Sequence, residues 1–234
     1  MNKYFGNDDL VMNTASRLPV CLCLDTSGSM AKNDAIQMLN KGVEHFYEAI
    51  KSNEQAVLSC EIAVVTFASE VTVAEEYSSV DTKATPSFKA DGGTAMAHGV
   101  NKALDMLEER KLEYKRNGVD YYQPWLVLIT DGKPGDLDDL PAAQERTRRL
   151  IADKKLVIFP IVVGNDDNEE KYHSIMQVVN GFCLENGRKS IHLKDLKFEE
   201  FFEWLGKSVS AVSMSQVGEK VKLDISTMDE WGEI

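Results

Sequence analysis

Residues 18–30 read LPVCLCLDTSGSM, an apolar run followed by a polar turn with one carboxylate, Asp25, at the junction. The apolar half is too short to span a membrane and is bounded by turn residues, which indicates a fully buried strand of a parallel sheet. A strand that leads into a helix places this turn at the carboxyl edge, where open α/β sheets bind ligands. Thr26, Ser27 and Ser29 add hydroxyl groups, so the turn offers only oxygen ligands. Such a set suits a hard cation such as Mg²⁺.

Composition limits the partners that the chain can have. Its 234 residues are 43% hydrophobic, which is enough for one large α/β domain with a substantial core. The net charge is −12, from 38 acidic and 26 basic residues. A nucleic acid or an anionic membrane would call for a basic face, so we expect neither as a partner.

The cysteines and the first residues indicate a cytoplasmic protein. Residues 1–17 contain no apolar core region, so they are not expected to form a secretory signal. The four cysteines, at positions 21, 23, 60 and 183, have the spacing of neither a zinc site nor a redox pair. We interpret them as small buried side chains that stay reduced.

Strand and helix patterns alternate along the chain. Amphipathic helices are predicted at about 33–51, 95–116, 137–155, 169–180 and 198–214. Apolar strands are predicted at 60–68, 125–130, 156–163 and 190–193, and a short edge strand at 71–77. The edge strand should be antiparallel to 60–68, because a two-residue link permits only a hairpin.

This alternation predicts the fold class. We expect an α/β fold with a doubly wound, mainly parallel six-stranded sheet, one antiparallel edge strand and helices on both faces. The chain should divide into an N-terminal arm (1–17), one domain (18–215) and an acidic C-terminal tail (216–234) that is loose from Gly218 onward.

Topology brings three distant segments to one crevice. In a sheet of order 3-2-1-4-5-6 the first and fourth strands are neighbours, and their connections leave in opposite directions. Asp25 ends the first of these strands, Asp131 ends the fourth, and the loop with Thr94 leads towards the fourth. Two carboxylates this close would each resist ionisation unless a cation joined them. The sequence therefore predicts a metal site at the carboxyl edge.

The same segments carry a resemblance to a known family. The run Asp25-Thr26-Ser27-Gly28-Ser29 resembles the Asp-x-Ser-x-Ser motif of von Willebrand factor A domains, which forms their metal-ion-dependent adhesion site. That family also uses a threonine in a mid-chain loop and an aspartate after a later strand. The resemblance implies a metal site made of Asp25, Ser27, Ser29, Thr94 and Asp131.

The family also implies how such a site works. The two serines would coordinate Mg²⁺, or Mn²⁺, directly, and Thr94 would do so in the ligand-engaged form. Asp25 and Asp131 would often act through water, and an Asp or Glu of a protein partner would complete the coordination. Lys133, Asp136 and its neighbours are interpreted as a solvated rim, and His98 as a packing or hydrogen-bonding residue.

Further segments are similar to bacterial tellurium-resistance proteins of the TerY type. They are residues 17–20, 65–67, 130–134, 201–205 and 208–210. This resemblance implies a cytoplasmic bacterial protein of a stress-response system. A protein kinase or phosphatase encoded nearby would be a candidate partner.

We therefore expect a metal-dependent protein-interaction module with no catalytic residues. One alternative is a metal-dependent phosphatase-like hydrolase, because a strand-end Asp25 beside hydroxyl groups is similar to haloacid dehalogenases. Those enzymes need a second aspartate two residues later, and Ser27 occupies that position. No nucleophile paired with a base and no phosphate-binding glycine loop is found. The other alternative is a structural assembly subunit with a vestigial metal site.

Overall fold

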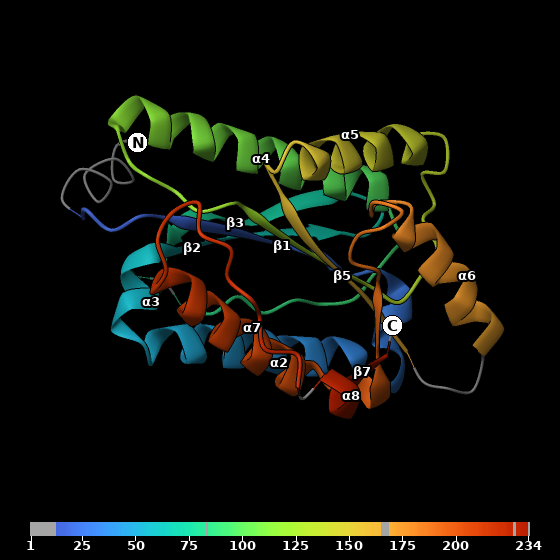
Figure 1. Ribbon diagram of the computed structural model, residues 1–234. Coiled ribbons are helices and arrows are strands. Elements are labelled where there is room, and N and C mark those ends of the chain that lie inside the picture. Colours follow the sequence, from blue (N-terminus) through green and yellow to red (C-terminus); the bar gives the residue numbers. More distant parts are fainter. Residues whose placement is uncertain (1–12, 83, 165–168, 227, 234) are drawn as a thin grey trace, which may run out of the picture.

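The apolar run at the start of the domain forms β1 (Leu18–Asp25), all of whose residues are buried. The computed structural model describes residues 13–82, 84–164, 169–226 and 228–233. It places β1 in the middle of a twisted sheet between two layers of helices (Figure 1). Parallel to β1 run the strands β2 (Cys60–Phe67), β4 (Trp125–Thr130), β5 (Val157–Val163) and β6 (Ile191–Leu193).

Within the described ranges, the strand order is β3-β2-β1-β4-β5-β6-β7. Strand β3 (Val71–Ser79) is antiparallel to β2 at one edge, so the predicted hairpin and order are confirmed. The predicted fold class, α/β with six mainly parallel strands and an antiparallel edge strand, is also confirmed. The structure adds β7 (Gly232–Glu233), two residues that pair antiparallel with β6 at the opposite edge.

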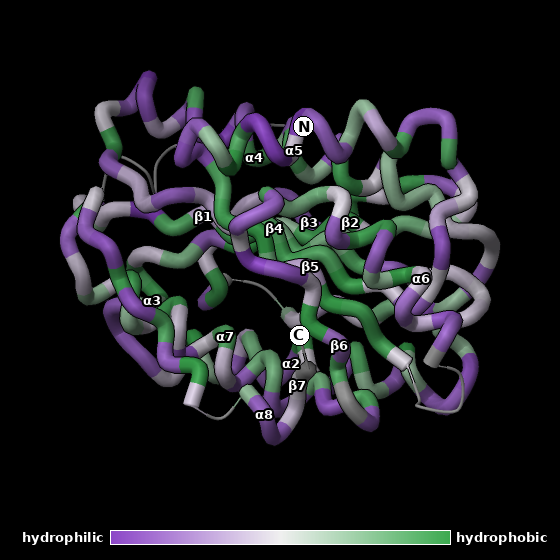
Figure 2. The backbone as a smooth tube through the Cα atoms, turned by 45° about the vertical axis from the view of Figure 1, so that its right-hand side comes forward, coloured by the Kyte–Doolittle hydropathy of each residue, from purple (hydrophilic) through white to green (hydrophobic). Residues whose placement is uncertain are grey.

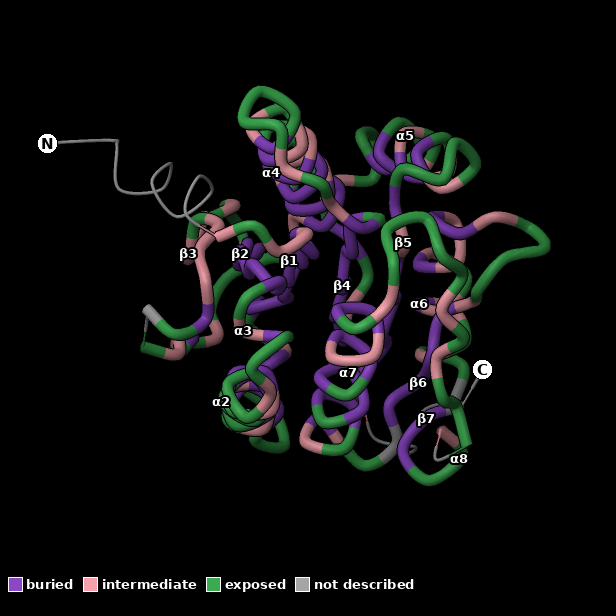
Figure 3. Tube along the Cα trace, turned by 60° about the vertical axis from the view of Figure 1, so that its left-hand side comes forward, coloured by how far each residue is buried: buried purple, intermediate pink, exposed green. Residues whose placement is uncertain are grey.

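Helices cover both faces of the sheet. One layer contains α2 (Ala35–Lys51), α3 (Glu54–Ser59) and α7 (Phe198–Ser213). The other contains α4 (Met96–Asn117), α5 (Leu140–Ala152) and α6 (Glu169–Asn180). The green, apolar strands in Figure 2 lie between helices whose outer parts are purple. Figure 3 shows the same central strands as buried.

Alternation along β1 divides its side chains between two cores. Val20, Leu22 and Leu24 pack in the core beneath α2 and α7, whereas Cys21 and Cys23 pack in the core beneath α4 and α5. All four cysteines are buried and free. Burial raises the pKa of the Cys183 thiol to about 11, and burial likewise raises that of the other three. The thiols therefore stay protonated, as expected of core residues.

Two predicted helix starts are shifted towards the C-terminus. Asn33 and Asp34 have φ angles of 51° and 58°, so they adopt left-handed conformations that an α-helix cannot contain. The chain therefore turns in the short 3₁₀ segment η1 (Gly28–Asp34) before α2 begins. In α5 the predicted start at Leu137 is three residues early, because that helix begins at Leu140 with a proline in its first turn.

The expectation of a loose C-terminal tail is wrong for the part that the structure describes. Val221 and Leu223 pack against the core, and the short helix α8 (Met228–Trp231) ends in a side chain that is only 2% exposed. The Trp231 ring lies 5.7 Å from that of Phe201 and 5.6 Å from that of Trp204, measured between centroids. These contacts attach the tail to α7.

None of the helices in the described ranges is both long and apolar enough to cross a bilayer.

Candidate metal centre

The carboxylate of Asp25 is fixed at the carboxyl end of β1. Its Oδ1 accepts a hydrogen bond from the Ser27 backbone N–H at 2.8 Å, and its Oδ2 accepts one from Thr130 Oγ1 at 2.6 Å. Thr130 ends the adjacent strand β4, and both side chains are fully buried. The two central strands therefore hold this carboxylate in one orientation.

A line of hydroxyl groups joins the β1 turn to Asp131. The Ser27 and Ser29 Oγ atoms are 3.0 Å apart, and Ser29 Oγ donates to Asp131 Oδ1 at 2.6 Å. Ser29 and Asp131 are 102 residues apart in sequence. Their contact arises because β1 and β4 are parallel neighbours that end at the same edge.

Backbone hydrogen bonds position the loop that carries Thr94. Gly28 N–H donates to Gly92 O at 3.0 Å, and Gly135 N–H donates to Thr94 O at 2.7 Å. Gly92 has a φ of 76°, a left-handed conformation that favours glycine. The loop is thereby tied to the turn after β1 on one side and to the loop after β4 on the other.

The side-chain oxygens of these segments converge beside Gly132. A Cβ atom placed on this glycine would lie 3.7 Å from Ser29 Oγ, 3.7 Å from Thr94 Oγ1 and 4.0 Å from Asp25 Oδ2. The structure thus brings all five predicted site residues together from three loops.

Burial makes the two carboxylates hard to ionise. Burial raises the pKa of Asp25 from its ordinary value of 3.8 to about 6, although hydrogen bonds from Ser27 and Thr130 oppose the shift. The pKa of Asp131 is also raised by burial, against the hydrogen bond from Ser29 and the positive charges of Lys171 and Lys32. A divalent cation between the carboxylates would favour their charged forms.

The donor set indicates which ions fit. Among the described residues, no three His, Cys, Asp or Glu side chains gather into a metal-binding group. An ion at this edge would therefore depend on two carboxylates and three hydroxyl groups. An oxygen-only set of low negative charge suits Mg²⁺ or Mn²⁺ better than Zn²⁺ or Cu²⁺.

Two contributors to the site were missed by the sequence reasoning. Thr130 orients Asp25, and its only sequence signal is a hydroxyl residue at the end of an apolar run. Asp136 accepts a hydrogen bond from the His98 backbone N–H at 2.9 Å and so holds the first turn of α4. The His98 ring lies 2.9 Å from Asp139 Oδ2, so it forms a hydrogen bond at the rim, as predicted.

The chain matches a known family model over most of its length. The model described as the von Willebrand factor type A domain matches residues 20–201. One curated relative, the calcium-activated chloride channel regulator 3A-1 of Mus musculus, is 28% identical over 144 residues. The match covers 58% of this chain but 14% of the relative, so the chain spans only about one seventh of that protein.

Solved structures share the fold at low sequence identity. The pilus adhesin SpaC from Lactobacillus rhamnosus GG has a TM-score of 0.65 and 14% identity, over 84% of this chain and 31% of SpaC. The vWF domain of the pilus tip protein Mfa5 from Porphyromonas gingivalis has a TM-score of 0.58 and 9% identity, over 88% of this chain and 99% of that domain.

A third similar structure contains a metal. Proximal thread matrix protein 1 from the mussel byssus, with a zinc-occupied MIDAS motif, has a TM-score of 0.53 and 19% identity. The match covers 87% of this chain and 47% of the mussel protein. At these identities the likeness shows the fold alone.

Proposed function

This chain belongs to the von Willebrand factor type A domain family, and from that premise we propose that it binds a partner protein through Mg²⁺ or Mn²⁺. Domains of this family are generally non-catalytic modules that bind protein partners, and many bind a divalent metal. The observation that carries the proposal is the convergence of Ser29, Thr94 and Asp25 oxygens beside Gly132. With Ser27 and Asp131, these residues would hold the ion.

The chemistry of the donor set supports a carboxylate as the partner's ligand. Three of the five ligands are neutral hydroxyl groups, so the bound ion would keep part of its positive charge. An ion of this kind favours an anionic oxygen, most simply an Asp or Glu side chain of the partner. The chain as a whole is strongly acidic and would otherwise repel such a group. Lys32 and Lys171 add local positive charge near Asp131.

Replacing Thr94 by alanine is expected to weaken Mg²⁺ binding about tenfold, or ~1.4 kcal/mol, because one hydroxyl ligand is lost. In the wild type, Mg²⁺ at about ten times its Kd should stabilise the fold by ~1.4 kcal/mol. Isothermal titration calorimetry and thermal melts measure the two effects. Thr72→Ala, an exposed threonine on β3, is the matched control and should bind like the wild type.

If titration with Mg²⁺ released or absorbed no heat of binding, and the melting temperature were the same in Mg²⁺ and in EDTA, the metal site would be refuted. Zn²⁺ is the appropriate competitor, since the mussel protein holds zinc at its MIDAS motif. Preferential binding of Zn²⁺ over Mg²⁺ by this chain would contradict the argument from its hydroxyl-rich donor set.

Partner binding should require both the metal and Asp25. Wild-type protein and Asp25→Ala would be immobilised and exposed to the same lysate in Mg²⁺ or in EDTA. A partner that uses the metal should be retained only by the wild type in Mg²⁺, and should be lost when one of its own acidic residues is replaced by alanine. Equal retention under all four conditions would assign binding to another surface.

The hydrolase alternative predicts measurable turnover. Its support is limited to a strand-end carboxylate beside a possible Mg²⁺ site, because Ser27 occupies the position of the second aspartate. The Ser29 hydroxyl adjoins the carboxylate of Asp131, which the proposal assigns to the metal. We expect no phosphatase activity above a buffer control with a generic phosphomonoester. Turnover that co-purifies with the protein and disappears in Asp25→Asn would favour the enzyme. A structural subunit with a vestigial site would instead show no metal binding.

We further propose a cellular role for this chain. It would be a cytoplasmic protein of a bacterial stress-response or tellurium-resistance system, with a kinase or phosphatase as a candidate partner. Its support is the resemblance at residues 17–20, 65–67, 130–134, 201–205 and 208–210. We also retain the division into an arm (1–17), a domain (18–215) and a tail (216–234). Identifying the protein retained only in Mg²⁺ tests this context.

A further inference from the structure

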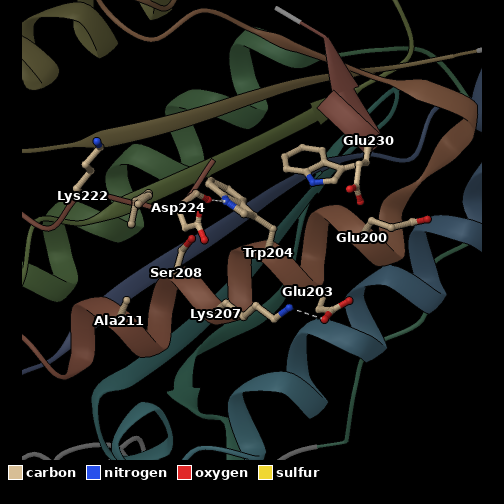
Figure 4. A pocket seen from close by; sticks show the side chains of 11 residues that line it. Glu200, Glu203, Trp204, Lys207, Ser208, Ala211, Lys222, Asp224 and Glu230 are labelled. Carbon is tan, nitrogen blue, oxygen red and sulfur yellow. Dashed lines mark hydrogen bonds and ion pairs between the residues drawn. The ribbon is translucent and has the colours of Figure 1, made fainter. Parts of the chain in front are cut away.

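A pocket of about 400 Å³ lies between α7 and the C-terminal segment that packs against it. Its lining comes from the outer side of α7 and from residues 222–231, and includes Trp204, Leu223 and Trp231 (Figure 4). None of the five candidate metal ligands lines it. The volume is within the range of sites for small ligands or single side chains.

The pocket contains a buried donor without a partner. Trp231 is 2% exposed, and its Nε1 has no hydrogen-bond acceptor among the described residues. By contrast, the Trp204 Nε1 donates to the backbone oxygen of Asp224. A buried N–H without an acceptor is unfavourable, so a ligand that presents an oxygen atom to Trp231 would gain free energy.

Charge at the pocket favours a cation. Glu200, Asp224 and Glu230 contribute carboxylates, while Glu203 pairs with Lys207 at 2.7 Å. Within the described residues, Glu200 and Glu230 form no ion pair. Both side chains are exposed to solvent.

The charged groups are not spread evenly around the pocket. In Figure 4, Glu200 and Glu230 lie at one end of the pocket and Lys222 at the other. A cation entering at the Glu200 end would meet two carboxylates, while the nearby amines of Lys207 and Lys197 are already bonded to Glu203 and to the backbone oxygen of Glu230.

We propose that this pocket binds a basic side chain, lysine or arginine, of a peptide segment in a partner protein. The aliphatic stem would lie against Trp204 and Leu223, and its charged end would approach Glu200 and Glu230. The carbonyl oxygen of the same residue would accept the hydrogen bond that Trp231 Nε1 lacks. The net charge of −12 would attract such a segment at long range.

The contact with Trp231 requires the C-terminal segment to shift outward, because Nε1 is buried. The segment is held by the two-residue strand β7 and by hydrogen bonds from Trp204 to Asp224 and from Lys197 Nζ to the backbone oxygen of Glu230. The Trp231 ring is also held by its contacts with Phe201 and Trp204, so the shift would move this ring relative to α7. Because the pocket shares no residue with the metal centre, binding here should be the same in Mg²⁺ and in EDTA.

The tryptophan indole signals of the full chain provide the test. The chain has three tryptophans, so a ¹⁵N–¹H correlation spectrum should show three indole signals, assigned with single Trp→Phe variants. The probe is the peptide acetyl-Gly-Lys-Gly-amide. We expect saturable shifts of the Trp231 and Trp204 signals with a Kd on the order of 1 mM, while the Trp125 signal stays in place.

A matched peptide and matched variants isolate the charge. Acetyl-Gly-norleucine-Gly-amide keeps the stem without the amine and should bind about fivefold more weakly than the lysine peptide. The double variant Glu200→Gln/Glu230→Gln should weaken binding of the lysine peptide about fivefold. This is the loss expected when two solvent-exposed ion pairs are removed. Glu44→Gln, an exposed acid on α2 outside this pocket, should bind like the wild type. Unchanged backbone amide signals would show that each variant is folded.

Three results would overturn the proposal. The first is the absence of any Trp231 shift at roughly ten times 1 mM peptide. The second is an equal shift with the norleucine peptide or in the double glutamine variant. The third is saturable binding of spermidine without binding of the lysine peptide, which would replace the partner protein by a free polyamine. All three are independent of the Mg²⁺ titration, so either proposal can fail alone.

Discussion

Replacing Glu61 by alanine is expected to lower the free energy of unfolding by about 3–5 kcal/mol, which is the cost of breaking a buried ion pair from one side. Glu61 is the second residue of β2 and is only 2% exposed, and its carboxylate accepts hydrogen bonds from Arg110 Nε at 2.7 Å and Nη2 at 2.9 Å. Tyr114 also donates to it, and Arg17 Nε lies 3.4 Å away. Alanine would leave Arg17 and Arg110, which are 1% and 8% exposed, without this carboxylate.

The pKa of Arg110 reflects two opposing effects, its burial and its interaction with Glu61. Burial alone would lower it, but the hydrogen bond to Glu61 and the charge of that carboxylate raise it overall. Removing Glu61 would therefore expose the full cost of burying a guanidinium group. Glu61→Ala should therefore lower the free energy of unfolding by more than the replacement of an exposed charged residue does.

Glu113→Ala is the matched control for Glu61→Ala. Glu113 also pairs with Arg110, at 2.5 Å, but its side chain is 43% exposed. Its loss should therefore cost less than about 1 kcal/mol. Urea unfolding measures both values by linear extrapolation. Similar losses in the two variants would show that burial does not strengthen the Glu61 pair.

Replacing Asp25 by asparagine is expected to stabilise the metal-free protein at pH 7 by about 1–3 kcal/mol and to abolish the response to Mg²⁺. The folded-state pKa of Asp25 is raised to about 6, so ionising this buried group at neutral pH opposes folding. Asparagine removes the charge but can still accept from Ser27 N–H. Its amide can donate to Thr130 Oγ1, whose hydroxyl can turn to the backbone oxygen of Gly132, 3.2 Å away.

The sign of the pH dependence follows from the raised pKa. The contribution of Asp25 to stability is fully present below 3.8, where both states are protonated, and is lost as the pH rises through about 6. Metal-free wild type should therefore lose stability relative to Asp25→Asn between about pH 4 and pH 7. Because Mg²⁺ requires the ionised carboxylate, its stabilising effect on the wild type should grow over the same interval.

Asp138→Asn, an exposed rim residue, is the control and should change neither the stability profile nor the Mg²⁺ response. Thermal melts of the three proteins from pH 4 to pH 8, with Mg²⁺ or EDTA, provide the measurement. An Asp25→Asn variant that is less stable than the wild type without metal at pH 7 would contradict the argument. It would mean that the ionised carboxylate stabilises the fold through its hydrogen bonds.

The sequence alone determined the architecture and the position of the candidate site. Apolar runs such as LPVCLCLD and WLVLIT indicate buried parallel strands, and their alternation with amphipathic helices predicts a doubly wound sheet. Once β1 and β4 are neighbours, Asp25 and Asp131 must lie at the same edge. Such inferences succeed because hydrophobic periodicity and strand polarity are properties of the chain itself.

Only the tertiary structure decided which polar groups are buried together. Glu61, Arg17 and Arg110 are charged residues that a sequence pattern assigns to solvent, and 49 residues separate Glu61 from Arg110. Trp231 lies in an acidic, aperiodic segment, yet it packs against α7 and closes one side of a pocket. Thr130 orients Asp25 across 105 residues. Contacts of this kind depend on distances between side chains that are remote in sequence, and no local pattern of hydrophobicity or charge encodes those distances.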